Sequence, residues 1–176
     1  MPSNPKIKAI RIERVWAMPS AWTFTIKPIK ELLIEEVTDG LWCDPFAGEN
    51  SPAQVTNDIN PERKATYHLD ALEFLKQQPT GHYDGVLLDP PYSHRQVSEH
   101  YKSVGMKVTG WHTSSGWTKA IKDEVHRITK KGGKVICFGW NSMGLGKGRG
   151  YEMTRLLLVP HGGSKNDTLV TVEIKS

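Results

Sequence analysis

Apolar runs and stretches of helical periodicity alternate along the chain. Apolar residues recur at helical spacing over residues 28–37, which open on a proline, and over 70–78, which open on an acidic residue suited to cap a helix. Three short apolar runs, within 40–48, 53–62 and 83–92, predict strands, and each stops at an aspartate or an asparagine. This part of the chain therefore predicts strands and helices in alternation.

The remaining segments predict more varied structure. Residues 8–16 alternate loosely and predict a first strand or a wrapped extended segment, whereas 93–118 are polar, have no clean period and predict a long loop. Residues 116–140 predict a helix, a stop at two consecutive glycines and a buried strand. A glycine-rich basic loop follows at 142–151, and residues 152–175 predict two strands joined by a turn.

Alternating strands and helices predict an α/β fold with a mainly parallel sheet, closed by a C-terminal antiparallel hairpin. Because the sequence has no repeat, low-complexity tract or long linker, we expect residues 1–176 to form a single domain without a separate target-recognition domain. About ten residues separate Asp44 from Val55, whereas a parallel crossover with a helix normally takes about a dozen or more. Ten extended residues span at most ~35 Å, so the first crossover helix is predicted to be absent or reduced to a turn.

Composition adds few constraints. The chain has 176 residues, of which 38% are hydrophobic and 24% charged, as is typical of a globular domain with a real core. No window approaches the ~18 apolar residues of a membrane span, and the N-terminus has no features of a secretory signal. Two cysteines are too few for a zinc site or a disulfide framework. We expect a cytoplasmic protein of a bacterial or phage-infected cell, without a membrane partner, and the net charge of +4 is compatible with a polyanionic one.

Polar residues follow three of the predicted strands, namely Asp44, Asn57 with Asp58, and Asp89. The carboxyl ends of parallel strands meet at one edge of a sheet and form a crevice there. A carboxylate in that crevice can accept hydrogen bonds from ribose hydroxyls or from an amine. Any one of these residues could simply start a turn, but the three together favour a binding crevice.

These motifs resemble those of the S-adenosylmethionine-dependent DNA amino-methyltransferases of the adenine-N6 type, over roughly residues 20–175. DPPY at 89–92 is similar to the catalytic tetrapeptide of that family, DPFAG at 44–48 to its cofactor motif, and FTIKP at 24–28 to the segment that precedes the cofactor strand. The combination is more specific than DPPY alone, which some RNA guanine methyltransferases share. The resemblance implies a Rossmann-like class I methyltransferase fold, S-adenosyl-L-methionine as cofactor, and DNA, or single-stranded DNA or RNA, as partner.

By this resemblance the catalytic residues are Asp89, Pro90, Pro91 and Tyr92. The exocyclic amine of adenine is a poor nucleophile, because its lone pair is delocalised into the ring. Hydrogen bonds from its N–H groups to the Asp89 carboxylate and the Pro90 carbonyl would favour a pyramidal nitrogen whose lone pair points at the methyl group. Tyr92 can stack on the extruded base. No metal is required, and the sequence has no cluster of metal ligands.

The resemblance also implies a set of cofactor contacts. Asp58 would accept from the ribose hydroxyls and Asp70 from the adenine amine, and Asp44 would lie near the methionine ammonium. Two phenylalanines would supply apolar contact, and the threonine and lysine of FTIKP would lie near the methionine carboxylate. Each residue also has an ordinary structural alternative, such as a helix cap for Asp70. The predicted set is Phe24, Thr25, Lys27, Asp44, Phe46, Gly48, Asn57, Asp58, Asp70 and Ala71.

The segment after the cofactor motif departs from the family pattern. The family usually reads DPFxGSGT followed by a helix, whereas this chain reads Gly48-Glu49-Asn50-Ser51-Pro52 and lacks the second glycine. We expect Glu49 or Asn50 to replace the contacts that the helix end would make to the cofactor.

Nucleic-acid contacts are expected in residues 93–118 and 142–151, where basic side chains can bind phosphates and aromatic side chains can stack on bases. Alternatively, Trp111 and Trp117 only pack residues 93–118 against the domain, and His94 is an exposed loop residue. The candidates are Ser93, His94, Arg95, Tyr101, Trp111, His112, Trp117, Lys147 and Arg149.

The leading hypothesis is therefore a small DNA adenine-N6 methyltransferase. An RNA adenine or DNA cytosine-N4 methyltransferase is the alternative among enzymes, because the target amine is alike. The missing glycine also allows a weakly active, methyltransferase-like nucleic-acid-binding subunit that needs a partner, either a second copy or another subunit.

Overall fold

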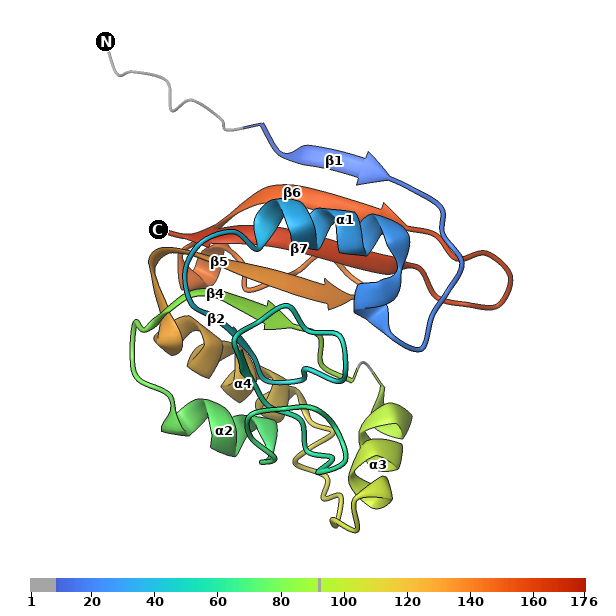
Figure 1. Cartoon of the computed structure of the whole chain (residues 1–176), viewed down its shortest axis with the longest axis vertical. Helices are drawn as coiled ribbons and strands as arrows, with labels where there is room; N and C mark the ends of the chain where they lie inside the picture. Colours follow the sequence, from blue (N-terminus) through green and yellow to red (C-terminus); the bar gives the residue numbers. More distant parts are fainter. Residues whose placement is uncertain (1–8, 92) are drawn as a thin grey trace.

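A seven-stranded sheet forms the centre of the molecule, in a computed structural model that describes residues 9–91 and 93–176 (Figure 1). The strands lie in the order β1-β6-β7-β5-β4-β2-β3. β7 is antiparallel to both of its neighbours, whereas all other pairs are parallel, so the predicted parallel sheet with an antiparallel hairpin is confirmed. The strands are β1 (Arg11–Arg14), β2 (Trp42–Asp44), β3 (Val55–Thr56), β4 (Tyr83–Leu88), β5 (Thr129–Gly139), β6 (Tyr151–Val159) and β7 (Thr168–Lys175).

Helices cover the sheet on both faces and bury two apolar cores. The helices are α1 (Lys27–Glu36), α2 (Ala71–Gln77), α3 (His94–Ser103) and α4 (Ser115–Ile128), with short 3₁₀ turns η1 (Thr23–Thr25) and η2 (Lys147–Arg149). α1 packs on β6, β7 and the middle of the sheet, and α2 and α4 pack on the other face. The alternation of strand side chains separates the cores: Leu87 faces α1, whereas Val86 and Leu88 face α2 and α4.

The first crossover, from β2 to β3, contains no helix among residues 45–54, as the short spacing predicted. The loop returns directly to the sheet edge: the Asn57 amide donates to Asp44 O at 2.8 Å, and the Ala47 amide donates to Asn57 O at 2.9 Å. The predicted helix over 70–78 also forms, and Asp70 caps it by accepting from the amides of Leu72 and Glu73.

The prediction of a long loop over 93–118 is wrong, because α3 and the start of α4 lie there. Ser93 caps α3 by accepting from the Gln96 amide, and only Val97 and Tyr101, four residues apart, are buried hydrophobics on this helix. Two buried apolar positions on an otherwise polar helix give too weak a periodic signal for recognition from sequence.

The predicted stop at two glycines is also misplaced. α4 ends at Ile128 and β5 begins at the next residue, where Thr129 is already extended. Gly132 and Gly133 lie inside β5, beside an irregularity in its pairing with β4. The glycines therefore mark a local distortion of the strand and not the end of the helix.

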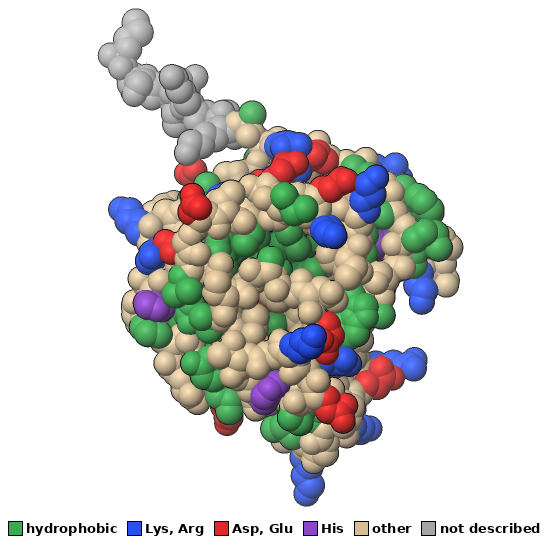
Figure 2. Space-filling model, in the orientation of Figure 1, with side chains coloured by type: hydrophobic (Ala, Val, Ile, Leu, Met, Phe, Trp, Pro, Cys, Tyr) green, Lys and Arg blue, Asp and Glu red, His purple; other side chains and the backbone are tan. Residues whose placement is uncertain are grey.

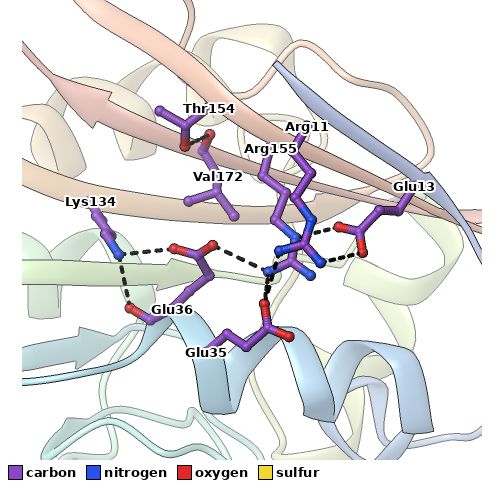
Figure 3. Close-up of polar contacts among 8 residues, drawn as sticks. All are labelled: Arg11, Glu13, Glu35, Glu36, Lys134, Thr154, Arg155 and Val172. Carbon is purple, nitrogen blue, oxygen red and sulfur yellow. Dashed lines mark hydrogen bonds and ion pairs between the residues drawn. The ribbon is translucent and has the colours of Figure 1, made fainter. Parts of the chain in front are cut away.

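A network of ion pairs attaches the edge strand β1 to the domain (Figure 3). Arg155 of β6 is only 7% exposed at its side chain and pairs with Glu13 of β1 at 2.6 Å and with Glu35 of α1 at 2.7 Å. It also reaches Glu36 at 3.3 Å, and Arg11 pairs with both Glu13 and Glu35. β1, β6 and α1 are thus joined through a buried guanidinium. Among the helices described, none is long and apolar enough to cross a membrane.

Candidate active site

A cavity of about 500 Å³ opens at the carboxyl ends of β2, β3 and β4, the edge where the sequence predicts a crevice. Its walls come from the segment at η1, the loop after β2, the residues that follow β3 and β4, and one side of α3. The structure brings most of the predicted catalytic and cofactor residues together here. Those that line the cavity are Phe24, Phe46, Gly48, Asn57, Asp58, Ala71, Asp89, Pro90 and Pro91.

Four predicted cofactor residues do not line this cavity: Thr25, Lys27, Asp44 and Asp70. Thr25 and Lys27 are exposed, and the Thr25 hydroxyl donates to Trp22 O at 2.8 Å. Of these two, Thr25 ends η1 and Lys27 begins α1, and neither lines the cavity. The predicted catalytic Tyr92 lies outside the described residues.

Asp89 follows β4 directly and is only partly exposed in the cavity wall. Desolvation raises the pKa of Asp89 to about 7, although a hydrogen bond with the Thr23 side chain lowers it in part. Thr23 belongs to η1, so the segment just ahead of the FTIKP motif contacts the predicted catalytic carboxyl. Near neutral pH this group can exist as a carboxylate that accepts, or as an acid that holds a proton.

Asp44 is completely buried below the cavity. Its carboxylate accepts from the Ser51 hydroxyl at 2.6 Å and from the Phe46 amide at 2.9 Å, and these bonds hold the shortened loop closed. Desolvation raises the pKa of Asp44 to about 7, against the effect of the two hydrogen bonds. In this arrangement the carboxylate shapes the loop, and its contact with a methionine ammonium stays a prediction.

Asp58 and Asn57 form the polar floor of the cavity at the end of β3. The Asp58 carboxylate accepts from the amides of Gly48 at 3.0 Å and Asn60 at 2.8 Å, and each oxygen keeps capacity for a further donor. The Asn57 amide group donates to Pro45 O and Leu69 O and accepts from the Leu69 amide. The side chain of Asn57 therefore connects three segments through its hydrogen bonds. The Asp58 carboxylate, in contrast, can still accept hydrogen bonds from a ligand.

Asp70 faces both α2 and α3. One carboxylate oxygen caps α2, and the other accepts a short hydrogen bond from the Tyr101 hydroxyl of α3. Burial raises the pKa of the Tyr101 phenol, and the bond to Asp70 raises it further, so the phenol stays protonated and donates. Tyr101 itself lines the cavity, so this bond fixes α3 as one of its walls.

A cluster of Trp22, Arg63 and Glu49 at the cavity rim was not predicted as a unit. The Arg63 guanidinium lies 4.9 Å from the centre of the Trp22 ring and pairs with Glu49 at 3.3 Å. All three residues line the cavity. Glu49 pairs with Arg63 in the cavity wall, and its expected contact with the cofactor stays a prediction. Nothing in the sequence near Arg63 signals a partner so distant along the chain.

A second, smaller cavity of about 210 Å³ shares the Pro90-Pro91 wall with the first. It lies between β5 and α4, and Trp117, Trp140 and Asn141 are among its lining residues. The two prolines after Asp89 thus separate two hollows on the same edge of the sheet.

The predicted nucleic-acid residues are scattered. Trp117 is 3% exposed, packs its ring edge against Phe46 and also lines the smaller cavity, so its stacking on a base stays a prediction. Arg149 is held by an ion pair with Asp123 at 2.8 Å. Trp111 is 50% exposed, and Lys147 is also exposed, so both remain available to a ligand.

The residues at the start of α3 give no further support for a nucleic-acid contact. Ser93 is the cap of α3, and Arg95 pairs with Glu99 along the exposed helix surface. The side chain of His94 lies outside the described structure. On the face drawn in Figure 2, Lys and Arg side chains are interspersed with Asp and Glu, so the net positive charge is not gathered into one basic patch there.

No protein-family model matches the chain, and no curated protein matches it by sequence. Among solved structures, yhhF of Escherichia coli, a protein assigned to the methyltransferases, is similar with a TM-score of 0.54 at 12% identity, over 91% of each chain. TrmN from Thermus thermophilus is similar with a TM-score of 0.57 at 16% identity, over 86% of this chain and 49% of that one.

A third similar structure is the 1,6-didemethyltoxoflavin-N1-methyltransferase of Burkholderia thailandensis, solved with 1,6-didemethyltoxoflavin and S-adenosylhomocysteine. The TM-score is 0.55 at 10% identity, over 84% of this chain and 76% of that one. Together with the strand order, these likenesses define the fold as that of the class I methyltransferases.

Proposed function

We propose that this protein transfers the methyl group of S-adenosylmethionine to the exocyclic N6 amine of adenine in DNA. The observation that carries the proposal is the position of Asp89-Pro90-Pro91, which line a large cavity, while the two prolines also line a smaller one. A methyl donor in the first cavity and a base at the second would meet at this tripeptide.

The residues of the large cavity fit the proposed cofactor. Its volume of about 500 Å³ is in the range of small-molecule sites. Asp58 offers carboxylate lone pairs to ribose hydroxyls, and Phe24 and Phe46 offer apolar surface. When bound, S-adenosylmethionine would supply an electrophilic methyl group on a sulfonium.

Asp89 and Pro90 would then act on the amine. The Asp89 carboxylate and the Pro90 carbonyl would accept from its two N–H groups and so free the nitrogen lone pair. After transfer the nitrogen carries an extra proton, and a carboxylate with a pKa of about 7 is well matched to receive it. Thr23, through its hydrogen bond to Asp89, would hold the carboxylate in place.

The choice of adenine in DNA depends on the motif resemblance, namely DPPY with DPFAG and FTIKP. The fold likeness to methyltransferases supports the reaction class but does not choose the acceptor. RNA adenine and DNA cytosine-N4 would present a similar amine, and the test below separates them.

The test is to incubate the purified chain with labelled S-adenosylmethionine and, in parallel, duplex DNA, single-stranded DNA and RNA, followed by digestion to nucleosides. We expect label in N6-methyldeoxyadenosine. Label in an RNA nucleoside alone, or in N4-methyldeoxycytidine, would overturn the substrate assignment. Absence of cofactor binding by calorimetry would overturn the enzymatic function itself.

A matched pair of isosteric variants tests the catalytic assignment. Asp89→Asn should lower kcat by roughly 10²–10⁴-fold, because the amide cannot receive a proton and presents donors to the amine. Its affinity for the cofactor should stay within about threefold of wild type. The control Asp39→Asn, at an exposed position before β2, should retain full activity. Near-normal transfer by Asp89→Asn would contradict the mechanism.

A further inference from the structure

We propose that the chain self-associates through β1, with the edge strands of two copies pairing antiparallel about Ile12 to form one continuous sheet. This inference concerns the opposite end of the sheet from the candidate active site and does not depend on the proposed function. β1 is the last strand in the sheet order, and no strand of the described chain pairs with its outer side.

The backbone of β1 presents a free row of hydrogen-bonding groups. The amides of Val15 and Ala17 donate inward, to Leu158 O at 3.0 Å and Pro160 O at 3.2 Å. Because backbone groups alternate in direction along a strand, the odd-numbered residues face β6 and the even-numbered residues face outward. Ile10, Ile12 and Arg14 therefore offer their N–H and C=O groups to a partner strand.

The same segment exposes large apolar side chains. Ile12 is 70% exposed, Trp16 is 59% and Ile10 is 44%. Ile12 pairs in register with Leu156 of β6, which is half-buried, on the sheet face opposite α1. An edge strand with exposed apolar side chains is a template for pairing with another strand.

The charges along β1 favour a second copy of this chain as the partner and determine how the two strands align. Antiparallel pairing about Ile12 places Ile12 opposite Ile12 and Arg11 opposite Glu13 of the second copy, in both directions. Shifting the axis to Glu13 places two glutamates opposite each other, and shifting it to Arg14 places two arginines opposite each other. Registers that pair odd with even residues would leave the outward backbone groups unmatched. Among these three registers, only the one about Ile12 matches the outward backbone groups and sets opposite charges across from each other, and it is self-complementary.

The β1 side chains that point to the α1 side of the sheet are already ordered by ion pairs within the chain. Arg11 and Glu13 lie beside Arg155 and Glu35, as Figure 3 shows, so both are held in one orientation by ion pairs. A second copy would extend this band of alternating charges across the new edge. Little side-chain entropy remains to be lost when the pair forms.

The predicted interface is small, since it consists of one short strand pair and the apolar strip of Ile12 with its neighbours. We therefore expect a dissociation constant on the order of micromolar to tens of micromolar. A twofold axis perpendicular to the sheet reverses the strand direction in the second copy. The two candidate active sites then open at opposite edges of the joined sheet, so each copy would act on its own substrate.

The test combines sedimentation velocity of the full chain with cross-linking of single-cysteine substitutions. A hydrogen-bonded antiparallel pair has Cα atoms about 5.5 Å apart, within the range a disulfide spans. Ile12→Cys should therefore form an intermolecular disulfide on mild oxidation. Ile34→Cys, at an equally exposed isoleucine on α1 (69% against 70%), and Arg14→Cys should form it at least about tenfold more slowly.

Ile12→Asp should weaken the dimer by about tenfold or more, whereas Ile34→Asp should leave it unchanged. Circular dichroism should show both variants folded. A wild-type chain that stays monomeric at about 100 μM, well above the expected dissociation constant, would overturn the proposal. So would a dimer in which Ile12→Cys cross-links no faster than Ile34→Cys.

Discussion

The Tyr101 hydroxyl of α3 donates a hydrogen bond to Asp70, the residue that caps α2. This bond connects α3, which lines the large cavity, to the start of α2, although the two residues are 31 positions apart in sequence. α3 otherwise buries few hydrophobic side chains, so the bond contributes much of what holds it against the cavity.

We expect Tyr101→Phe to weaken cofactor binding by about three- to tenfold with little change in kcat, because a hydrogen bond to a charged group contributes ~1.5–3 kcal/mol and part of that loss should loosen the cavity wall. Isothermal titration calorimetry measures the binding. Tyr83→Phe is the matched control, since its hydroxyl donates to Gln78 at 2.6 Å, and neither residue lines the cavity. Equal effects of the two variants on cofactor affinity would contradict a role for α3 as a cavity wall.

The pKa of Asp89 leads to a second prediction. Since burial raises this pKa to about 7 and only the ionised carboxyl can accept from the amine, kcat/KM should rise with pH through about 7 and level off above it. Thr23→Val removes the hydrogen bond that lowers the pKa, so the rising limb should move to higher pH. A pH-rate profile of both proteins checks this, and an unmoved limb in Thr23→Val would show that another group titrates.

Much of the sheet edge could be predicted from the sequence, because short-range signals determine it. The apolar run of β4 stops at Asp89 and two prolines, and the residue count between Asp44 and Val55 excludes an ordinary crossover helix. Asp58 and Asp89 follow parallel strands on either side of β2, so their shared edge follows from topology alone.

The parts that could not be predicted depend on contacts between distant segments. Trp22 and Arg63 contact each other at the cavity, but the sequence around either residue gives no indication of this contact. The burial of Trp117 likewise follows from the packing of α4 on Phe46 and not from its neighbours in sequence. From sequence alone, an aromatic side chain in a polar segment is equally compatible with stacking on a base and with packing in the core.

The buried Asp44 gives a third prediction, on stability. Its folded pKa of about 7 lies above its ordinary value, so the folded state binds more protons than the unfolded state between about pH 4 and 7. Asp44 therefore makes the free energy of unfolding fall as pH rises through that window, and its contribution is constant above it.

Ser51→Ala removes the 2.6 Å hydrogen bond that favours the ionised form. We expect a loss of ~1–2 kcal/mol at pH 8 and a smaller loss at pH 5, where Asp44 is mostly protonated. Urea unfolding at the two pH values, without cofactor, measures both. The control Ser142→Ala changes an exposed serine and should have no effect at either pH. A larger loss at pH 5 than at pH 8 would contradict the raised pKa.

The last prediction concerns Arg155, whose buried guanidinium binds three glutamates from β1 and α1. Arg155→Met keeps much of the side-chain volume but leaves Glu13, Glu35 and Glu36 without their common cation. Arg11 still pairs with Glu13 and Glu35, and Lys134 with Glu36, so the carboxylates keep part of their compensation. Because breaking a fully buried ion pair costs about 3–5 kcal/mol, we expect unfolding to become easier by about 2–3 kcal/mol at pH 7. Chemical denaturation measures the loss.

The pH dependence of that loss tests its cause. The hydrogen bond and charge of Arg155 lower the pKa of Glu13, so the stability that Glu13 contributes is present above its ordinary pKa and disappears as pH falls through its lowered folded value. The difference between wild type and Arg155→Met should therefore shrink as pH falls from the ordinary glutamate value of 4.5 through the lowered folded pKa of Glu13. Arg95→Met breaks an exposed pair with Glu99 and should leave the stability nearly unchanged. If Arg155→Met costs as little as Arg95→Met, the network does not anchor β1.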